Sequence, residues 1–115
     1  MEFDRWTDER LLHAPPAGAA GRTFEAFYCR HERLIAAYHL RRVPDPETAA
    51  DLTAETFAQA LESRVRFEPR GPGSAGRWLY GIAANVRSMS VPEATIRKRV
   101  SRGIAALRKA VQESA

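Results

Sequence analysis

Basic side chains gather near the end of the sequence, where they could bind the phosphate groups of a nucleic acid. Residues 92–111 carry a net charge of +5, since Glu93 is the one acidic residue among them. At 100° per residue, Thr95, Lys98, Arg99 and Arg102 fall on the same side of a helix. Hydroxyl, ammonium and guanidinium donors in such an array can contact phosphates and base edges. The pattern predicts nucleic-acid binding, but a basic amphipathic helix can equally lie on a membrane or on another protein.

Acidic side chains form a second charged group in the middle of the chain. Residues 45–62 contain five acidic residues and no Lys or Arg. In a helix, Asp51, Glu55 and Glu62 share one face and form an acidic ridge. Nothing beside them would make one carboxyl a general acid and another a base. The ridge is therefore interpreted as a docking surface or as a solvated helix face.

Residues that could carry catalysis or bind a metal ion are sparse. The sequence contains no phosphate loop, no HExxH and no CxxC, and no nucleophile stands beside a histidine. His13, His31 and His39 are scattered, and His31 is expected to pack in the core. Cys29 is the single cysteine. We therefore expect neither an enzyme nor a protein with a metal ion or another cofactor.

The composition is that of one small, basic domain. The chain has 115 residues and a net charge of +4, so the part outside residues 92–111 carries about −1. A single cysteine excludes an internal disulfide, and a reduced, cytoplasmic setting is the simplest expectation. No apolar run approaches the roughly 18 residues of a membrane span, so no membrane partner is expected.

The elements that must position these side chains are all predicted to be helical. Apolar residues at helical spacing predict helices from about Thr23 to Arg42, Pro46 to Arg64, Ser74 to Arg87 and Pro92 to Gln112. The first three form a bundle, followed by one basic amphipathic helix. Residues 1–22 are expected to be a flexible segment without a packing pattern, with at most one helical turn around residues 8–13.

Caps and apolar stripes give these predictions their detail. Thr23 and Asp45 are the predicted N-caps of the first two helices, with Pro46 in the first turn of the second. The stripe of the first helix consists of Phe24, Phe27, Tyr28, His31, Leu34, Ile35 and Tyr38. The stripe of the second consists of Ala50, Ala54, Phe57, Ala58 and Leu61. The stripe of the third consists of Trp78, Leu79, Ile82, Ala83 and Val86.

The order of the segments resembles domain two of bacterial RNA polymerase sigma factors, in particular the extracytoplasmic-function (ECF) group. The most specific pieces are AADLTAETF at 49–57 and WLYGIAAN at 78–85. SVPEATIRKRVSRGIAALRK at 90–109 resembles the last helix of domain four, the recognition helix of a helix-turn-helix. The resemblance implies sigma domain two at 23–87, a short junction at 88–91 and a remnant of domain four at 92–112.

This resemblance also implies partners and roles. In the family, an acidic helix of domain two docks on the clamp helices of the polymerase's largest subunit, and Asp51 and Glu55 match those positions. The family binds the −10 promoter element with residues that correspond here to Arg66, Arg70, Arg77, Asn85 and Arg87. The remnant recognition helix would use Thr95, Lys98, Arg99 and Arg102. The implied partners are RNA polymerase core, promoter DNA and an anti-sigma factor.

The sequence departs from the family pattern in two ways. Ala54 and Ala84 stand where the family often has a glutamine and a basic residue. More importantly, the junction replaces the linker and the supporting helices that precede the recognition helix in the family. Because those helices hold the recognition helix at a fixed angle in the major groove, we expect recognition of the −35 element to be impaired.

Three functions remain open at this point. The chain could initiate transcription like a sigma factor, or it could titrate polymerase or an anti-sigma factor without initiating. It could also be a helical nucleic-acid-binding protein unrelated to polymerase. A functional short form, a decayed gene and a deletion in the gene model would all give this sequence.

Overall fold

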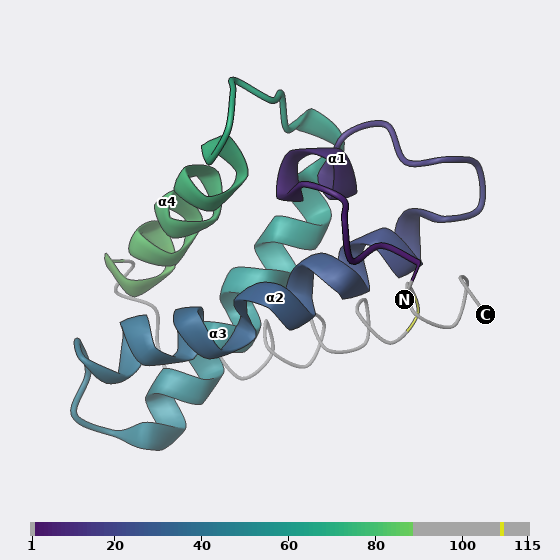
Figure 1. Ribbon diagram of the computed structural model, residues 1–115. Coiled ribbons are helices and arrows are strands. Elements are labelled where there is room, and N and C mark those ends of the chain that lie inside the picture. Colours follow the sequence, from purple (N-terminus) through teal and green to yellow (C-terminus); the bar gives the residue numbers. More distant parts are fainter. Residues whose placement is uncertain (1, 89–108, 110–115) are drawn as a thin grey trace.

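The computed structural model describes residues 2–88 and 109, and every regular element between residues 2 and 88 is helical (Figure 1). The elements are α1 (Asp8–Leu12), α2 (Ala20–Leu40), α3 (Pro46–Ser63), the 3-10 turn η1 (Arg64–Arg66) and α4 (Ser74–Ser88). α3 packs against both α2 and α4, and α1 contacts α2 and α4. The predicted all-helical fold is confirmed for this part of the chain. The basic helix predicted at 92–112 lies outside the described residues, apart from Lys109, which is helical and exposed.

The start of α2 differs from its prediction. The helix begins at Ala20, and Ala19 is its N-cap without a side-chain hydrogen bond. Thr23 was predicted to be this N-cap, but it lies inside the helix and its hydroxyl donates to the carbonyl oxygen of Ala20 at 3.1 Å. The prediction was wrong because the buried positions extend back to Ala19 and Gly21, one turn before the aromatic residues.

The start of α3 agrees with its prediction. The Asp45 carboxylate accepts hydrogen bonds from the Thr48 backbone N–H at 3.1 Å and from the Thr48 hydroxyl at 2.8 Å. These bonds lower the pKa of Asp45, as expected for an N-cap carboxylate. Pro46 follows in the first turn, where its missing N–H costs nothing.

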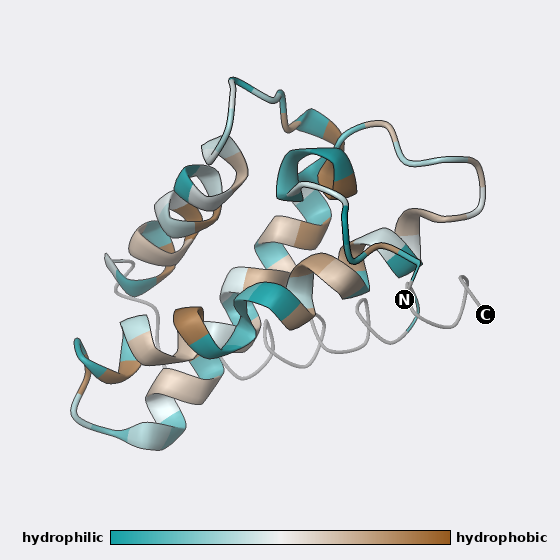
Figure 2. Ribbon diagram, viewed as in Figure 1, coloured by the Kyte–Doolittle hydropathy of each residue, from teal (hydrophilic) through white to brown (hydrophobic). Residues whose placement is uncertain are grey.

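The core is built from aromatic and aliphatic side chains of all four α-helices. Phe24, Phe27 and Ile35 of α2 meet Phe57 of α3 and Leu79 of α4, and all five are almost completely buried. Hydrophobic residues recur along each helix between hydrophilic ones, as expected for amphipathic helices (Figure 2). This core fixes the three long helices relative to one another.

Residues 2–19 are part of this bundle, so the expectation of a flexible segment without a packing pattern was wrong, whereas the helical turn expected around residues 8–13 is confirmed by α1. Leu11 and Leu12 are 1% and 3% exposed, and Phe3 and Trp6 pack against the core. Thr7 caps α1 by accepting the backbone N–H of Arg10 at 3.1 Å. The sequence signal was weak because one helical turn places only two apolar residues in the core.

The burial predicted for the apolar stripes was also wrong at two positions. Leu34 is 56% exposed, because it lies at the edge of the buried face of α2. Ala50 is exposed, whereas Ala49 is buried, since α3 turns its buried face toward both α2 and α4. The third stripe holds: Leu79, Ala83 and Val86 are buried, and Trp78 and Ile82 are half-buried.

Candidate functional site

A basic surface runs from η1 through the following loop into α4. Arg66 ends η1, Arg70 lies in the loop, and Arg77 and Arg87 lie in the first and last turns of α4. All four side chains are exposed, and within residues 2–88 none of them forms an ion pair. Between residues 64 and 88 the sequence has five arginines and one acidic residue, the exposed Glu68. The arrangement can therefore attract a polyanion without first breaking internal salt bridges.

The outer face of α4 is flat as well as basic. At 100° per residue, the exposed Arg77, Tyr80, Gly81 and Asn85 lie opposite the buried side of the helix. Tyr80 is 36% exposed, and its ring packs edge-on against Tyr38 of α2 at a centroid distance of 5.5 Å. Small side chains between polar ones allow close approach of an extended strand, and an exposed aromatic ring is a surface on which a base can stack.

Trp78 packs against the core beneath this surface, as its place in the apolar stripe of the third helix predicted. Its ring packs against the buried Phe67 at a centroid distance of 5.2 Å. Phe67 directly follows η1, so the loop that carries Arg70 is attached to α4 at this point. Trp78 is a packing residue and is only half-buried.

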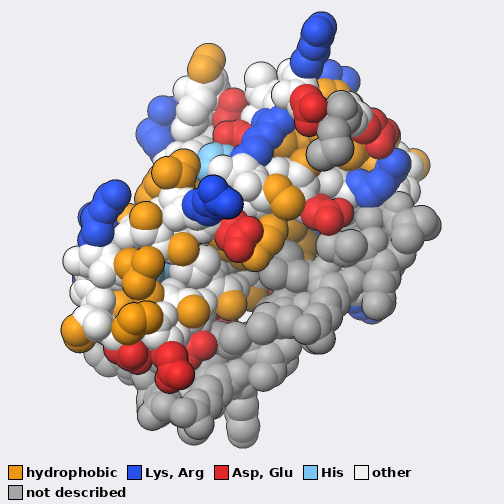
Figure 3. Space-filling model, turned by 60° about the horizontal axis from the view of Figure 1, so that its bottom comes forward, with side chains coloured by type: hydrophobic (Ala, Val, Ile, Leu, Met, Phe, Trp, Pro, Cys, Tyr) orange, Lys and Arg blue, Asp and Glu red, His pale blue; other side chains and the backbone are white. Residues whose placement is uncertain are grey.

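The acidic residues of α3 are not equivalent. Asp51 is half-buried and Glu62 is exposed, but Glu55 is only 5% exposed and its carboxylate accepts the Gln59 side-chain amide at 3.2 Å. The expected acidic ridge, interpreted as a docking surface or a solvated helix face, is therefore not formed at Glu55, whose side chain is buried. On the face drawn in Figure 3, Asp and Glu side chains gather at the lower left, and no Lys or Arg side chain of the described residues is drawn beside them.

A buried polar pair that the sequence did not reveal joins α2 to α3. His39 is completely buried, and its Nε2 lies 3.0 Å from the hydroxyl of Thr56. That hydroxyl donates to the Leu52 carbonyl oxygen at 2.7 Å, so its oxygen accepts from His39 and Nε2 carries the hydrogen. The position of His39 four residues after Ile35, on the buried face, was the available signal.

This environment keeps His39 neutral. Burial, together with the positive charges of Arg87 and Arg42, lowers the pKa of His39 to about 4. Nδ1 of His39 has no hydrogen-bond partner among the described residues. The neutral imidazole donates a hydrogen bond that connects α2 to α3. Because the side chain is completely buried, it cannot act as a base toward a substrate.

A second polar group fixes the N-terminal segment on α2. The Arg30 guanidinium donates to the carbonyl oxygens of Trp6 at 2.6 Å and Phe3 at 2.7 Å, and to the Asp8 carboxylate at 3.1 Å. The other carboxylate oxygen of Asp8 lies 2.9 Å from Nε2 of His31. His31 also packs on Phe27, so it is a structural residue, as expected.

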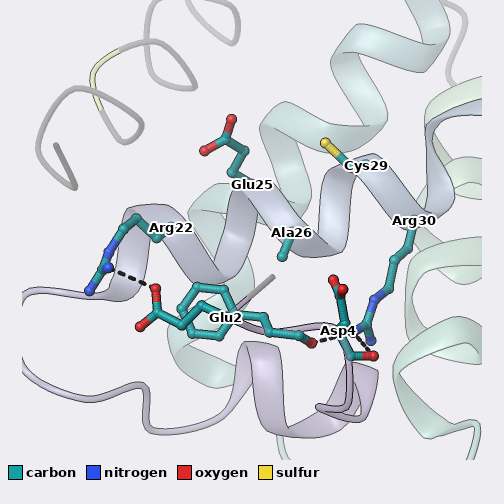
Figure 4. A pocket seen from close by; sticks show the side chains of 8 residues that line it. Glu2, Asp4, Arg22, Glu25, Ala26, Cys29 and Arg30 are labelled. Atoms are coloured by element: carbon teal, nitrogen blue, oxygen red, sulfur yellow. Dashed lines mark hydrogen bonds and ion pairs between the residues drawn. The ribbon is translucent and has the colours of Figure 1, made fainter.

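A groove with a volume of about 440 Å³ lies between this segment and α2 (Figure 4). Arg22 and Glu2 form an ion pair of 3.0 Å at one end, and Arg30 and Asp4 lie at the other (Figure 4). Cys29 lies at its edge, and burial together with Glu25 and Glu32 raises the pKa of the thiol. The thiol therefore stays protonated near neutral pH and is a poor nucleophile.

The described part of the chain contains neither a cluster of metal ligands nor a membrane-spanning helix. Residues 2–88 and 109 contain no group of three or more His, Cys, Asp or Glu side chains that could bind a metal ion. Nor is any helix among them long and apolar enough to cross a membrane.

The predicted site residues thus fall on two surfaces. Arg66, Arg70, Arg77, Asn85 and Arg87 all lie exposed on η1, the loop and α4. Asp51 and Glu55 lie on α3, where Asp51 is half-buried and Glu55 is buried. The residues predicted for the recognition helix, Thr95, Lys98, Arg99 and Arg102, lie outside the described residues.

Comparison with known proteins relates most of this bundle to a family of transcription proteins. The RNA polymerase sigma factor YlaC of Bacillus subtilis (strain 168) is 39% identical over 61 residues, which cover 53% of this chain and 34% of the relative. The chain therefore matches about a third of the length of this relative. No solved structure matches significantly. The family model for sigma-70 region 2 matches residues 27–90, more than half of the chain. This protein belongs to the sigma-70 region 2 family.

Proposed function

We propose that the chain is a sigma-factor-like transcription initiation protein of the ECF group that binds RNA polymerase core and −10 promoter DNA. The observation that carries this proposal is the separation of charge. Glu68 is the one acidic residue between 64 and 88, the range of the basic surface of η1, the loop and α4, and α3 lies within residues 45–63, which contain no basic residue. Two surfaces of opposite charge on one small bundle suit two different partners.

The DNA would bind along α4 and the loop before it. Arg66, Arg70, Arg77 and Arg87 would contact phosphates, because guanidinium groups bind them in bidentate geometry. The side-chain amide of Asn85 can donate to and accept from a base edge. A melted strand suits this face better than a duplex, because small residues and the exposed Tyr80 ring allow bases to lie against it.

The polymerase would bind on α3. Asp51 and Glu62 present carboxylates at the surface, where they can pair with basic groups on the clamp helices of the largest subunit. Glu55 is buried, so its carboxylate must gain exposure before it can take part. The direct contact is therefore assigned first to Asp51.

A second function is favoured by the short junction in the sequence. Residues 88–91 join the sigma-like bundle directly to the stretch that resembles a recognition helix. If that stretch does not recognise the −35 element, a chain that still binds polymerase would compete with other sigma factors and lower transcription without initiating it. A chain that titrates an anti-sigma factor would instead release the sigma factor that it inhibits.

Transcription by purified core polymerase separates these functions. The template is a library randomised over the −35 and −10 regions, and the transcripts are sequenced. Transcripts that depend on the −10 sequence and tolerate any −35 sequence support initiation. Binding to core without transcripts supports the competitor for polymerase, and failure to bind core contradicts both initiation and competition for polymerase.

A further inference from the structure

The first turn of α4 lacks a cap from its own side chains. The first N–H groups of a helix have no acceptor within the helix. The N-cap position is Gly73, which has no side chain, and the hydroxyl of Ser74, the first residue of the helix, accepts the backbone N–H of Arg70 at 3.0 Å. Ala75 is completely buried, so its N–H needs a protein acceptor.

That acceptor comes from the other end of the sequence. The Glu9 carboxylate of α1 accepts the backbone N–H of Ala75 at 3.0 Å, across 66 residues of chain. A negative charge at this position also interacts favourably with the positive end of the helix dipole. Glu9 therefore acts as a cap of α4 supplied by a different helix.

Glu9 is itself held firmly. The preceding residue, Asp8, bonds to Arg30 and His31 of α2. The Leu11 and Leu12 side chains bury α1 in the core. α1 thus forms a brace that sets the start of α4 against α2.

The loop that Glu9 restrains needs such a restraint. Gly71 and Gly73 have φ angles of 89° and 83°, in a region that glycine adopts at little cost, so these two positions can take other conformations although the ring of Pro72 between them fixes φ there. One end of the loop is fixed by Phe67 on Trp78. The other end is fixed by the bonds of Ser74 and Ala75.

We infer that Glu9 is a positioning residue that holds the loop and the first turn of α4, and with them Arg70 and Arg77, in the orientation that binds DNA. This inference rests on the proposed function. Glu9 itself does not contact the DNA. It acts through the Ala75 N–H.

The sign of the expected effect distinguishes positioning from simple electrostatics. Glu9 is negatively charged, so removing its charge should by itself strengthen binding of a polyanion. If Glu9 positions the loop, Glu9→Ala should weaken binding in spite of the lost negative charge. Glu9→Gln keeps an oxygen acceptor for the Ala75 N–H and should bind DNA as the original chain does.

The test measures the binding of the full chain to a fluorescein-labelled single-stranded DNA of mixed sequence by anisotropy. We expect about fivefold weaker binding for Glu9→Ala, since the cap interaction is of this size, and a change below about twofold for Glu9→Gln. Glu25→Ala removes an exposed acidic charge on α2 and serves as the control. It should bind as tightly as the original chain, or more tightly.

Amide hydrogen exchange provides the second readout. Glu9→Ala should lower the protection of the Ala75 amide about tenfold and leave the amides at the centres of α2 and α3 unchanged. An equal loss at all amides would show a purely structural role and overturn the inference. DNA binding by Glu9→Ala as tight as that of Glu25→Ala would also overturn it and leave the proposed function intact. If the original chain binds no DNA, both are overturned.

Discussion

His39 is neutral inside the bundle because burial and the positive charges of two nearby arginines disfavour its protonated form. The side chain is completely buried, and Arg42 and Arg87 lie near enough to lower its pKa to about 4. The ordinary pKa of histidine in an unfolded chain is about 6.5. Between these values the unfolded state binds a proton that the folded state does not bind, so stability rises with pH in this window.

Acidification should therefore destabilise the fold through His39. Between pH 7.5 and pH 5 the free energy of unfolding should fall by about 2 kcal/mol, and this loss should be absent in His39→Leu. Urea denaturation at both pH values measures it. His13→Gln, at an exposed histidine, is the control and should keep the full loss. A His39→Leu chain with the same pH dependence as the original would contradict the assignment.

Thr56 and Thr53 form a matched pair for the bond to His39. Both are buried on α3 and both hydroxyls donate to the carbonyl oxygen four residues earlier, but only Thr56 also accepts from His39. Thr56→Val should leave the His39 donor unsatisfied and cost about 1–3 kcal/mol of unfolding free energy. Thr53→Val should cost less than about 1 kcal/mol. Equal losses in chemical denaturation would refute a specific His39–Thr56 bond.

At the scale of elements, α1 is the part of the fold that the sequence predicted least well. It has only five helical residues, yet it contributes Leu11 and Leu12 to the core and Glu9 to the cap of α4. The brace that it forms connects α2 to α4. Loss of its packing should therefore affect the whole bundle.

Leu11→Ala tests this connection. The side chain is 1% exposed, so its truncation should leave a cavity and lower the unfolding free energy by about 2–5 kcal/mol. Leu34→Ala makes the same chemical change at a site that is 56% exposed, and its effect should stay within about 0.5 kcal/mol. Similar stabilities of the two variants would show that residues 2–19 do not pack as described.

The basic loop and α4 should bind nucleic acid mainly through phosphates. Arg70→Gln and Arg77→Gln should each weaken binding of single-stranded DNA about threefold to tenfold at low salt and reduce the slope of log K against log[salt] by about 0.7. Arg33→Gln, at an exposed site on α2, is the control for a general change in charge. An unchanged salt slope in both loop variants would exclude them from the interface.

The long helices were predictable because each carries a repeating signal. α3 and α4 start where they were predicted to start, and the Asp45 cap and the buried Leu79 of the third stripe follow from local rules. What the sequence could not reveal depends on contacts between distant residues. The Glu9–Ala75 bond spans 66 residues, and the burial of Glu55 and His39 follows from the way the helices are oriented against each other. No periodicity within a single helix contains that information.

In the whole molecule, the two charged surfaces lie on different helices of one bundle. α3 lies in the acidic stretch and α4 continues the basic one, and the two helices pack directly against each other. The proposed function requires that a partner on one surface leaves the other accessible. This separation is the central claim, since a sigma-like protein must bind polymerase and DNA at the same time.

Retention on immobilised RNA polymerase core tests this claim most directly. Asp51→Arg with Glu62→Arg should reduce retention at least about tenfold, because two attractive charges become repulsive. Arg70→Gln with Arg77→Gln should be retained like the original chain, and so should Glu25→Arg on α2. Equal retention of the Asp51/Glu62 double variant and the original chain would contradict the assignment of α3 to polymerase and of α4 to DNA.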